Sequence, residues 1–192
     1  MAKLSKKVFE MSLLCAETLK PDLGKRFGKD SAIYNSKYFP VLFEFTYFFI
    51  NLTDRYAFNQ LGHERRNELS DELVPATVHA TIETLFGHCQ QNIRDGIERD
   101  FYSNLNNAQM DYGSCKELLL DPKDDVPTVE KLESGAKSKS MIGRLTDNLS
   151  QIIEGEINRS ALFTILIWEV VIESLRKREL QTLVSEASKE IK

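Results

Sequence analysis

The sequence is poor in the residues that build β-rich, disulfide-stapled or metal-bound proteins. Its 192 residues include only nine glycines, three histidines and three cysteines. Few glycines and no sustained alternation of apolar and polar residues argue against a β-sheet. The odd number of cysteines and their wide separation exclude a disulfide framework and a C-x-x-C metal pair. We therefore expect reduced thiols and a cytoplasmic location.

Long hydrophobic runs are also missing. The longest apolar stretches are interrupted by Glu44 and Glu169, so none reaches the roughly 18 residues that a membrane-spanning helix needs. The first 20 residues have a basic start, but Glu10 interrupts their apolar part. Their apolar residues also recur at helical spacing, as Leu4, Val8, Met11 and Cys15 show. We interpret this segment as the first helix of the fold and not as a signal peptide.

Neither sign of charge dominates. Lysine and arginine number 25 against 29 aspartates and glutamates, for a formal net charge of −4. Such a balance suits a soluble protein but creates no field that would attract nucleic acid or anionic lipid. Hydrophobic residues at 42% and charged residues at 28% are typical of a folded globular chain. We therefore predict a single domain over residues 1–192, with no nucleic-acid or membrane partner.

Apolar periodicity predicts an all-α bundle of about six helices. Two of them, at about 37–61 and 158–184, are apolar in nearly every direction over much of their length, which is typical of central helices. Residues 88–112 carry a single apolar stripe and are predicted to form a surface helix. Another amphipathic helix is expected from Met141 to Ile153.

Prolines, glycines and dense charge indicate where these helices end. We expect a loop over residues 20–35 and a helix over 64–87 that Pro75 kinks or splits near Val74. Residues 121–140 contain two prolines and many charges, followed by a run of Gly, Ser and Lys. That composition predicts a mobile internal linker.

The helix at 37–61 carries a polar stripe among its aromatic residues. At about 100° per residue, the side chains of Glu44, Asn51 and Arg55 project in nearly the same direction. In the last helix, Glu169 is the only charge between Ala161 and Ile172. Because an unpaired buried charge is very costly, each of these groups should find a partner or face a wet cavity.

Two interpretations of the polar stripe remain open. In the first, Glu44 or Glu169 pairs with Arg55, Arg144 or Arg176 in a buried network that fixes the register of the helices. In the second, the stripe lines a ligand pocket between helices, where bundle folds often place their sites. The ligand-binding candidates are then Glu44, Asn51, Arg55, His79, Glu83 and Glu169.

The partner predicted for Glu44 is His79 or Glu83. If the segments before and after Gly62 form an antiparallel hairpin, residues 44 and 79 lie about 27 and 26 Å from the turn, at the same level. His79 and Glu83 share one helix face and are weak candidates for metal ligands. The sequence lacks the Glu-x-x-His pairs of di-iron bundles, so we predict no metal and no cofactor.

No motif in the sequence specifies a catalytic chemistry. The segment HERRN at 63–67 has Asn where a zinc-protease helix needs its second His. We therefore favour a non-catalytic binding or interaction protein, with a protein partner or a homodimer, and a small-molecule ligand as a further candidate partner. The alternative is a metal- or small-molecule-dependent enzyme with a site between the central helices. Whether the chain is an enzyme stays open at this point.

Overall fold

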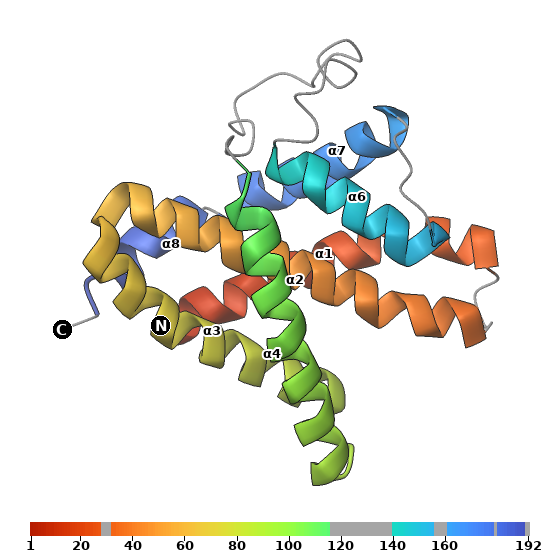
Figure 1. Ribbon diagram of the computed structural model, residues 1–192, viewed down its shortest axis with the longest axis horizontal. Helices are drawn as coiled ribbons and strands as arrows, with labels where there is room; N and C mark the ends of the chain where they lie inside the picture. Colours follow the sequence, from red (N-terminus) through yellow and green to blue (C-terminus); the bar gives the residue numbers. More distant parts are fainter. Residues whose placement is uncertain (28–31, 116–139, 156–160, 179, 191–192) are drawn as a thin grey trace.

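The computed structural model shows an all-α fold, as the sequence predicts. It describes residues 1–27, 32–115, 140–155, 161–178 and 180–190. Within these ranges there are seven α-helices and no β-strand (Figure 1). The helices are α1 (Ala2–Phe27), α2 (Ala32–Leu61), α3 (His63–Phe86), α4 (Gln91–Gly113), α6 (Met141–Glu154), α7 (Ala161–Arg178) and α8 (Leu180–Ala187).

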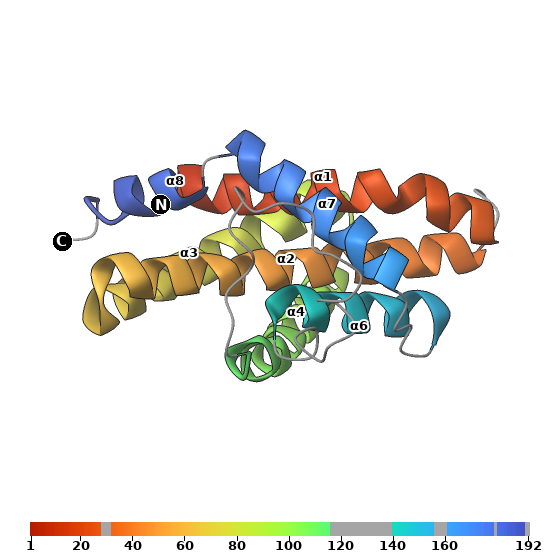
Figure 2. The ribbon, with the colours of Figure 1, turned by 90° about the horizontal axis from the view of Figure 1, so that it is seen from above.

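The helices are arranged in layers, and α2 lies between them. Figure 2 shows α1, α7 and α8 on one side of α2 and the crossing pair α4 and α6 on the other. The ammonium group of Met1 pairs with Glu190, and Lys3 pairs with Glu186 at 2.8 Å, so the two ends of the chain lie side by side. The layers on both sides of α2 remove it from solvent.

The aromatic middle of α2 forms much of the core. Between positions 41 and 57 every residue is buried except Phe43, Asp54 and Arg55, which are partly exposed. Among the buried residues, Phe45 and Phe48 have no exposed surface at all. Burial of apolar surface stabilises the fold by about 25 cal/mol per Å². A helix that is apolar in nearly every direction gains most from this interior position.

Helix α1 presents one apolar face to the rest of the fold. Leu4, Val8, Met11 and Cys15 are all buried on that face, as their spacing predicts. The prediction of a loop over residues 20–35 is wrong in extent, since α1 continues to Phe27 and α2 already begins at Ala32. Pro21 and Pro40 lie inside these helices with their rings exposed. Each proline removes one backbone hydrogen-bond donor from its helix.

Helix α3 is continuous through Pro75, so the proline does not split it. Gly62 separates α2 from α3 with φ of +77°, a conformation that side-chain-bearing residues rarely adopt. Gly87 follows the last residue of α3, as the sequence predicts.

Helix α4 is buried only along its second half. Phe101, Leu105, Ala108 and Tyr112 are buried, whereas Ile93 in the first turn is 48% exposed. Figure 1 gives the reason: the first turns of α4 extend past α2 together with the end of α3. The predicted surface helix is therefore present, but its apolar stripe is covered only where it crosses α2.

The predicted C-terminal helix at 158–184 corresponds to two elements, α7 and α8. Four consecutive charged residues, at 176–179, lie where the two elements divide. Helix α7 is not apolar on all sides, because Glu169, Glu173 and Arg176 are exposed while Ile167 and Val171 are buried. The predicted linker at 121–140 lies outside the described residues except for Ser140. The hydroxyl of Ser140 accepts a hydrogen bond from the backbone N–H of Gly143 and caps α6.

None of the helices in the described ranges combines the length and the apolar character that crossing a lipid bilayer requires.

Candidate functional site

The buried carboxylate of Glu44 is held by side chains from two other helices. Its Oε1 accepts hydrogen bonds from the Tyr112 hydroxyl of α4 at 2.5 Å and from the Asn148 amide of α6 at 2.8 Å. The same amide lies 3.4 Å from Oδ2 of Asp111. The guanidinium of Arg144 faces the other oxygen of Asp111, also at 3.4 Å. These five residues connect α2, α4 and α6 through one polar network.

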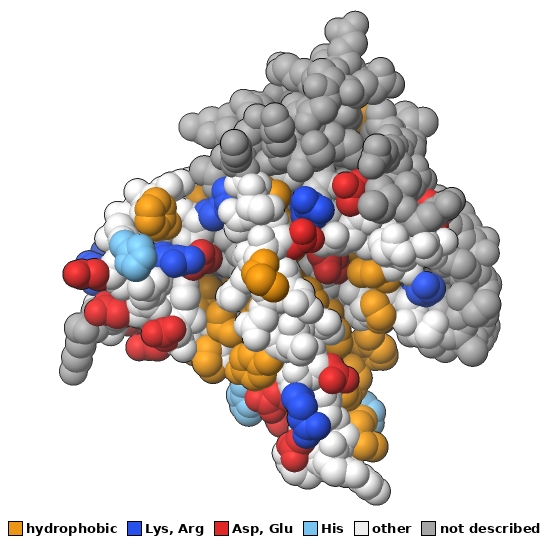
Figure 3. All heavy atoms as spheres, viewed as in Figure 1, with side chains coloured by type: hydrophobic (Ala, Val, Ile, Leu, Met, Phe, Trp, Pro, Cys, Tyr) orange, Lys and Arg blue, Asp and Glu red, His pale blue; other side chains and the backbone are white. Residues whose placement is uncertain are grey.

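The network borders a cavity of about 700 Å³ between α2, α4 and α6. Glu44 and Tyr47 of α2 form its floor, and exposed residues such as Asn107 and Met110 of α4 stand at its rim. In Figure 3, acidic and apolar side chains gather beside α4 on this face of the molecule. The described lining residues are Pro40, Phe43, Glu44, Tyr47, Asn104, Asn107, Ala108, Met110, Asp111, Asn148 and Ile152.

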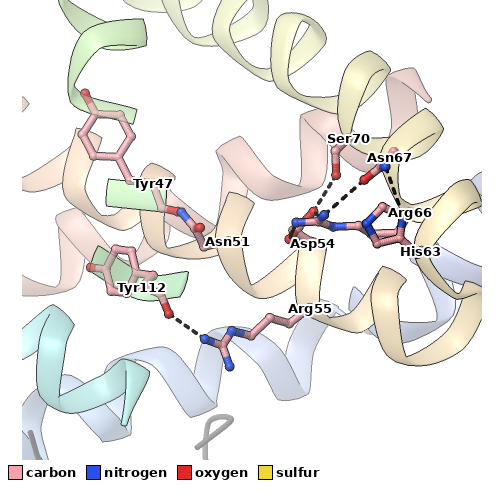
Figure 4. Close-up of polar contacts among 9 residues, drawn as sticks. All are labelled: Tyr47, Asn51, Asp54, Arg55, His63, Arg66, Asn67, Ser70 and Tyr112. Carbon is pink, nitrogen blue, oxygen red and sulfur yellow. Dashed lines mark hydrogen bonds and ion pairs between the residues drawn. The ribbon is translucent and has the colours of Figure 1, made fainter. Parts of the chain in front are cut away.

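The hydroxyl of Tyr47 is a buried polar group without a hydrogen-bond partner among the described residues. Tyr47 is only 5% exposed, and its ring packs edge-to-face on Phe101 with centroids 4.8 Å apart. Asn104 lies close enough to lower the pKa of the hydroxyl, but it does not meet the geometry of a hydrogen bond. Figure 4 shows the hydroxyl pointing toward α4. Since buried polar groups are normally paired, the described residues leave the hydrogen bonding of this hydroxyl incomplete.

Burial dominates the electrostatics of the site. It raises the pKa of the Glu44 carboxyl, and the nearby charge of Asp111 raises it further. The hydrogen bonds from Tyr112 and Asn148 act in the opposite direction because they stabilise the carboxylate. Burial and the charge of Glu44 also raise the pKa of the Tyr47 and Tyr112 hydroxyls. Both tyrosines are therefore neutral at physiological pH.

The polar stripe predicted on α2 is present, but its members have different roles. Asn51 donates to the carbonyl of Tyr47 in its own helix at 2.8 Å. Arg55 reaches α4 and donates to the carbonyls of Tyr112 and Cys115, both at 2.6 Å (Figure 4). The last carbonyls of a helix lack intrahelical donors, so Arg55 caps the end of α4. Only Glu44 of the three lines the large cavity.

A second polar cluster joins α2 to α3 beside the turn at Gly62. The Asp54 carboxylate accepts hydrogen bonds from Nε and Nη2 of Arg66 at 2.7 and 2.6 Å. The hydroxyl of Ser70 also donates to it, at 2.6 Å (Figure 4). Asp54 was not among the predicted site residues. These three hydrogen bonds satisfy the Asp54 carboxylate, and the cluster fixes the angle between the two helices.

The prediction that Glu44 pairs with His79 or Glu83 is wrong. His79 is exposed on α3, and Glu83 pairs with Arg94 of α4 at 2.6 Å. Figure 1 shows α3 diverging from α2 after the turn, and α4 and α6 supply the groups that meet Glu44. Glu169, the remaining candidate, is exposed on α7.

Tyr112, Asn148 and Asp111 belong to the site but were not among the residues predicted for it. Tyr112 looked like an ordinary residue of an apolar stripe, and Asn148 adjoins the buried Leu149. They lie 68 and 104 residues from Glu44 along the chain, so no local pattern could pair them with it. The one available signal was the polar hydroxyl of Tyr112 at the end of the predicted apolar stripe over residues 88–112.

Metal ligands do not gather in the described part of the chain: no three His, Cys, Asp or Glu side chains are placed to hold a metal ion there. No protein-family model, no curated protein and no solved structure matches this chain.

Proposed function

We propose that this chain is a non-catalytic binding protein whose cavity between α2, α4 and α6 takes a small molecule with an apolar body and a polar head group. The observation that carries the proposal is the buried hydroxyl of Tyr47, which has no partner among the described residues and lies beside Glu44 on the cavity floor. Leaving such a group unpaired costs about 1–3 kcal/mol, and a ligand that bonds to it recovers this cost.

The size and lining of the cavity support the same proposal. Ligand pockets typically measure about 300–1,000 Å³ and combine apolar walls with a few polar groups that orient the ligand. This cavity measures about 700 Å³. Phe43 and Ile152 supply apolar walls, while Glu44, Tyr47 and three asparagines supply hydrogen-bonding groups.

Binding is favoured over catalysis by the kind of residues that line the cavity. Among the described lining residues there is no His, Cys, Ser or Lys that could act as a nucleophile or move a proton near neutral pH. The Glu44 carboxyl has a raised pKa, which is a property of many catalytic acids. Here it already accepts two hydrogen bonds on one oxygen from the surrounding helices, which suits a fixed recognition group.

A fragment screen with two matched tryptophan variants tests the proposal. Asn107 and Asn106 are adjacent exposed residues of α4, but only Asn107 lines the cavity. Asn107→Trp should fill the cavity without disturbing the core, whereas Asn106→Trp adds the same side chain toward solvent. Ligand-observed NMR should detect fragments that bind the wild type and Asn106→Trp but not Asn107→Trp. Fragments that bind all three proteins equally, or no bound fragment at all, would refute the proposal.

A further inference from the structure

We infer that the head group of the ligand is an organic cation, namely a protonated amine attached to an apolar or aromatic body. This inference rests on the proposed binding function and specifies the chemical class of the ligand. It is carried by the charges at the cavity, by the free hydrogen-bond acceptors on its floor and by the apolar walls beside them.

The charged groups that line the cavity are carboxylates. Glu44 and Asp111 are among the lining residues, and no Lys, Arg or His is present in the described lining. Arg144 faces Asp111 at 3.4 Å and partly neutralises it. No basic side chain of the described residues lies within 4.0 Å of the Glu44 carboxylate. No basic side chain of the described residues thus balances the negative charge of the Glu44 carboxylate, and a cationic ligand would supply that positive charge.

The floor of the cavity also offers acceptors to a donor-rich group. Both hydrogen bonds that the described residues donate to Glu44 end on Oε1, and none of these residues donates to Oε2. Tyr47, whose hydroxyl oxygen has no partner among the described residues, and Asn104 also line this cavity. An ammonium group has three donors and no acceptor, so it matches this set of acceptors. A carboxylate or phosphate would instead meet repulsion from Glu44 and Asp111.

The apolar walls distinguish such a ligand from an inorganic cation. Phe43, Ala108 and Ile152 line the cavity beside the carboxylates. The ring of Phe43 is held edge-to-face against Phe101 at 5.2 Å, so its position is supported by the core. A hydrated metal ion would leave these walls in contact with water, whereas an alkyl or aryl amine would cover them.

Three probes with the same body and different head groups test the inference. Tryptamine, tryptophol and indole-3-propionate each carry an indole ring on a two-carbon arm that ends in an ammonium, a hydroxyl or a carboxylate. Isothermal titration calorimetry of the full chain at low ionic strength should show tightest binding of tryptamine. The expected preference over tryptophol is about tenfold, with the propionate weakest. Equal affinity for tryptamine and tryptophol, or no binding of tryptamine at millimolar concentration, would overturn the inference.

Glu44→Gln and Asp111→Asn identify the carboxylate that recognises the cation. Glu44→Gln keeps the shape of the side chain and removes its charge, so it should abolish the tenfold preference of the cavity for tryptamine over tryptophol. Asp111→Asn should reduce the preference less, because Arg144 already faces that carboxylate. A preference that survives in Glu44→Gln would overturn the assignment to Glu44. If the wild type binds all three probes with equal affinity and Asn107→Trp binds none of them, the cavity is upheld as a binding site. The same result rejects the cationic ligand.

Discussion

The hydroxyl of Tyr112 on α4 donates a hydrogen bond to Oε1 of Glu44 on α2, and both side chains are buried. Tyr112 also packs its ring edge-to-face on Phe48, with centroids 5.7 Å apart. One tyrosine therefore connects the hydrophobic core to the polar floor of the cavity. This contact fixes where α4 crosses α2, because sliding α4 by one turn would remove one of the two donors of the Glu44 carboxylate.

Tyr112→Phe should destabilise the protein by about 1–3 kcal/mol, because it removes a hydrogen bond to a buried carboxylate while keeping the ring. Urea unfolding followed by circular dichroism measures the change. Tyr102→Phe on the same helix is the control, since its hydroxyl makes no hydrogen bond with the described residues and should cost much less. Equal midpoints for the two variants would show that the bond to Glu44 contributes little.

Replacement of Glu44 by Gln should change the pH dependence of stability. Burial raises the pKa of Glu44 in the folded state, so the folded protein binds its proton more tightly than the unfolded chain. The stabilisation from this proton is complete below the unfolded pKa of about 4.3 and is lost as pH rises through the folded pKa. Glu44→Gln has no such proton, so its stability relative to the wild type should rise across that window.

Urea titrations at a series of pH values measure this difference. Glu72→Gln, an exposed glutamate on α3, is the control and should follow the wild type at every pH. If the difference between Glu44→Gln and the wild type does not vary with pH, then burial does not shift the titration of Glu44.

The Asp54–Arg66 pair should contribute a measurable coupling between α2 and α3. Its two hydrogen bonds are short, and its side chains are 22% and 33% exposed, so screening by water is partial. A double-mutant cycle with Asp54→Asn and Arg66→Gln should give a coupling of about 1 kcal/mol in the free energy of unfolding. The exposed Lys3–Glu186 pair is the matched control and should show no coupling above error. Equal couplings for the two pairs would contradict a role of Asp54 in holding the helices.

Phe48→Ala should destabilise the protein by about 3–5 kcal/mol, because Phe48 has no exposed surface and its loss leaves a cavity in the core. Phe58→Ala is a control on the same helix: Phe58 is 51% exposed, so its removal should cost far less. Denaturant midpoints of the two variants give the comparison. An unchanged midpoint for Phe48→Ala would be incompatible with the position of α2 in the core.

Two glycine substitutions should change stability in opposite directions. Gly62 has φ of +77° and ψ of −178°, so Gly62→Ala should cost about 1–3 kcal/mol of backbone strain. Gly96 lies inside α4 with no atom within 4 Å of an added Cβ, so Gly96→Ala should stabilise by about 0.5–1 kcal/mol. Thermal unfolding of the two variants checks the signs. A Gly62→Ala variant as stable as the wild type would show that the turn relaxes to another conformation.

Local patterns predicted the helices well where the spacing of apolar residues defined a buried face and where a glycine marked the end of a helix. The apolar face of α1 and the ends of helices at Gly62 and Gly87 follow from short stretches of sequence, and the structure confirms them. The loop predicted over residues 20–35 was too long because α1 continues past Pro21. Whether the helix continues past it depends on the packing of its other residues. The predicted homodimer and the cytoplasmic location stay predictions.

The sequence alone determined that α2 is buried and that a carboxylate at position 44 needs a polar partner. Both follow from the composition of one helix and from the cost of burying an unpaired charge. Only the tertiary structure decided that the partners are Tyr112 and Asn148 and that a cavity opens beside them. Those residues come from distant helices whose crossing depends on the shape of the whole core. Helical periodicity defines the face on which a residue lies, but packing decides which helix meets that face.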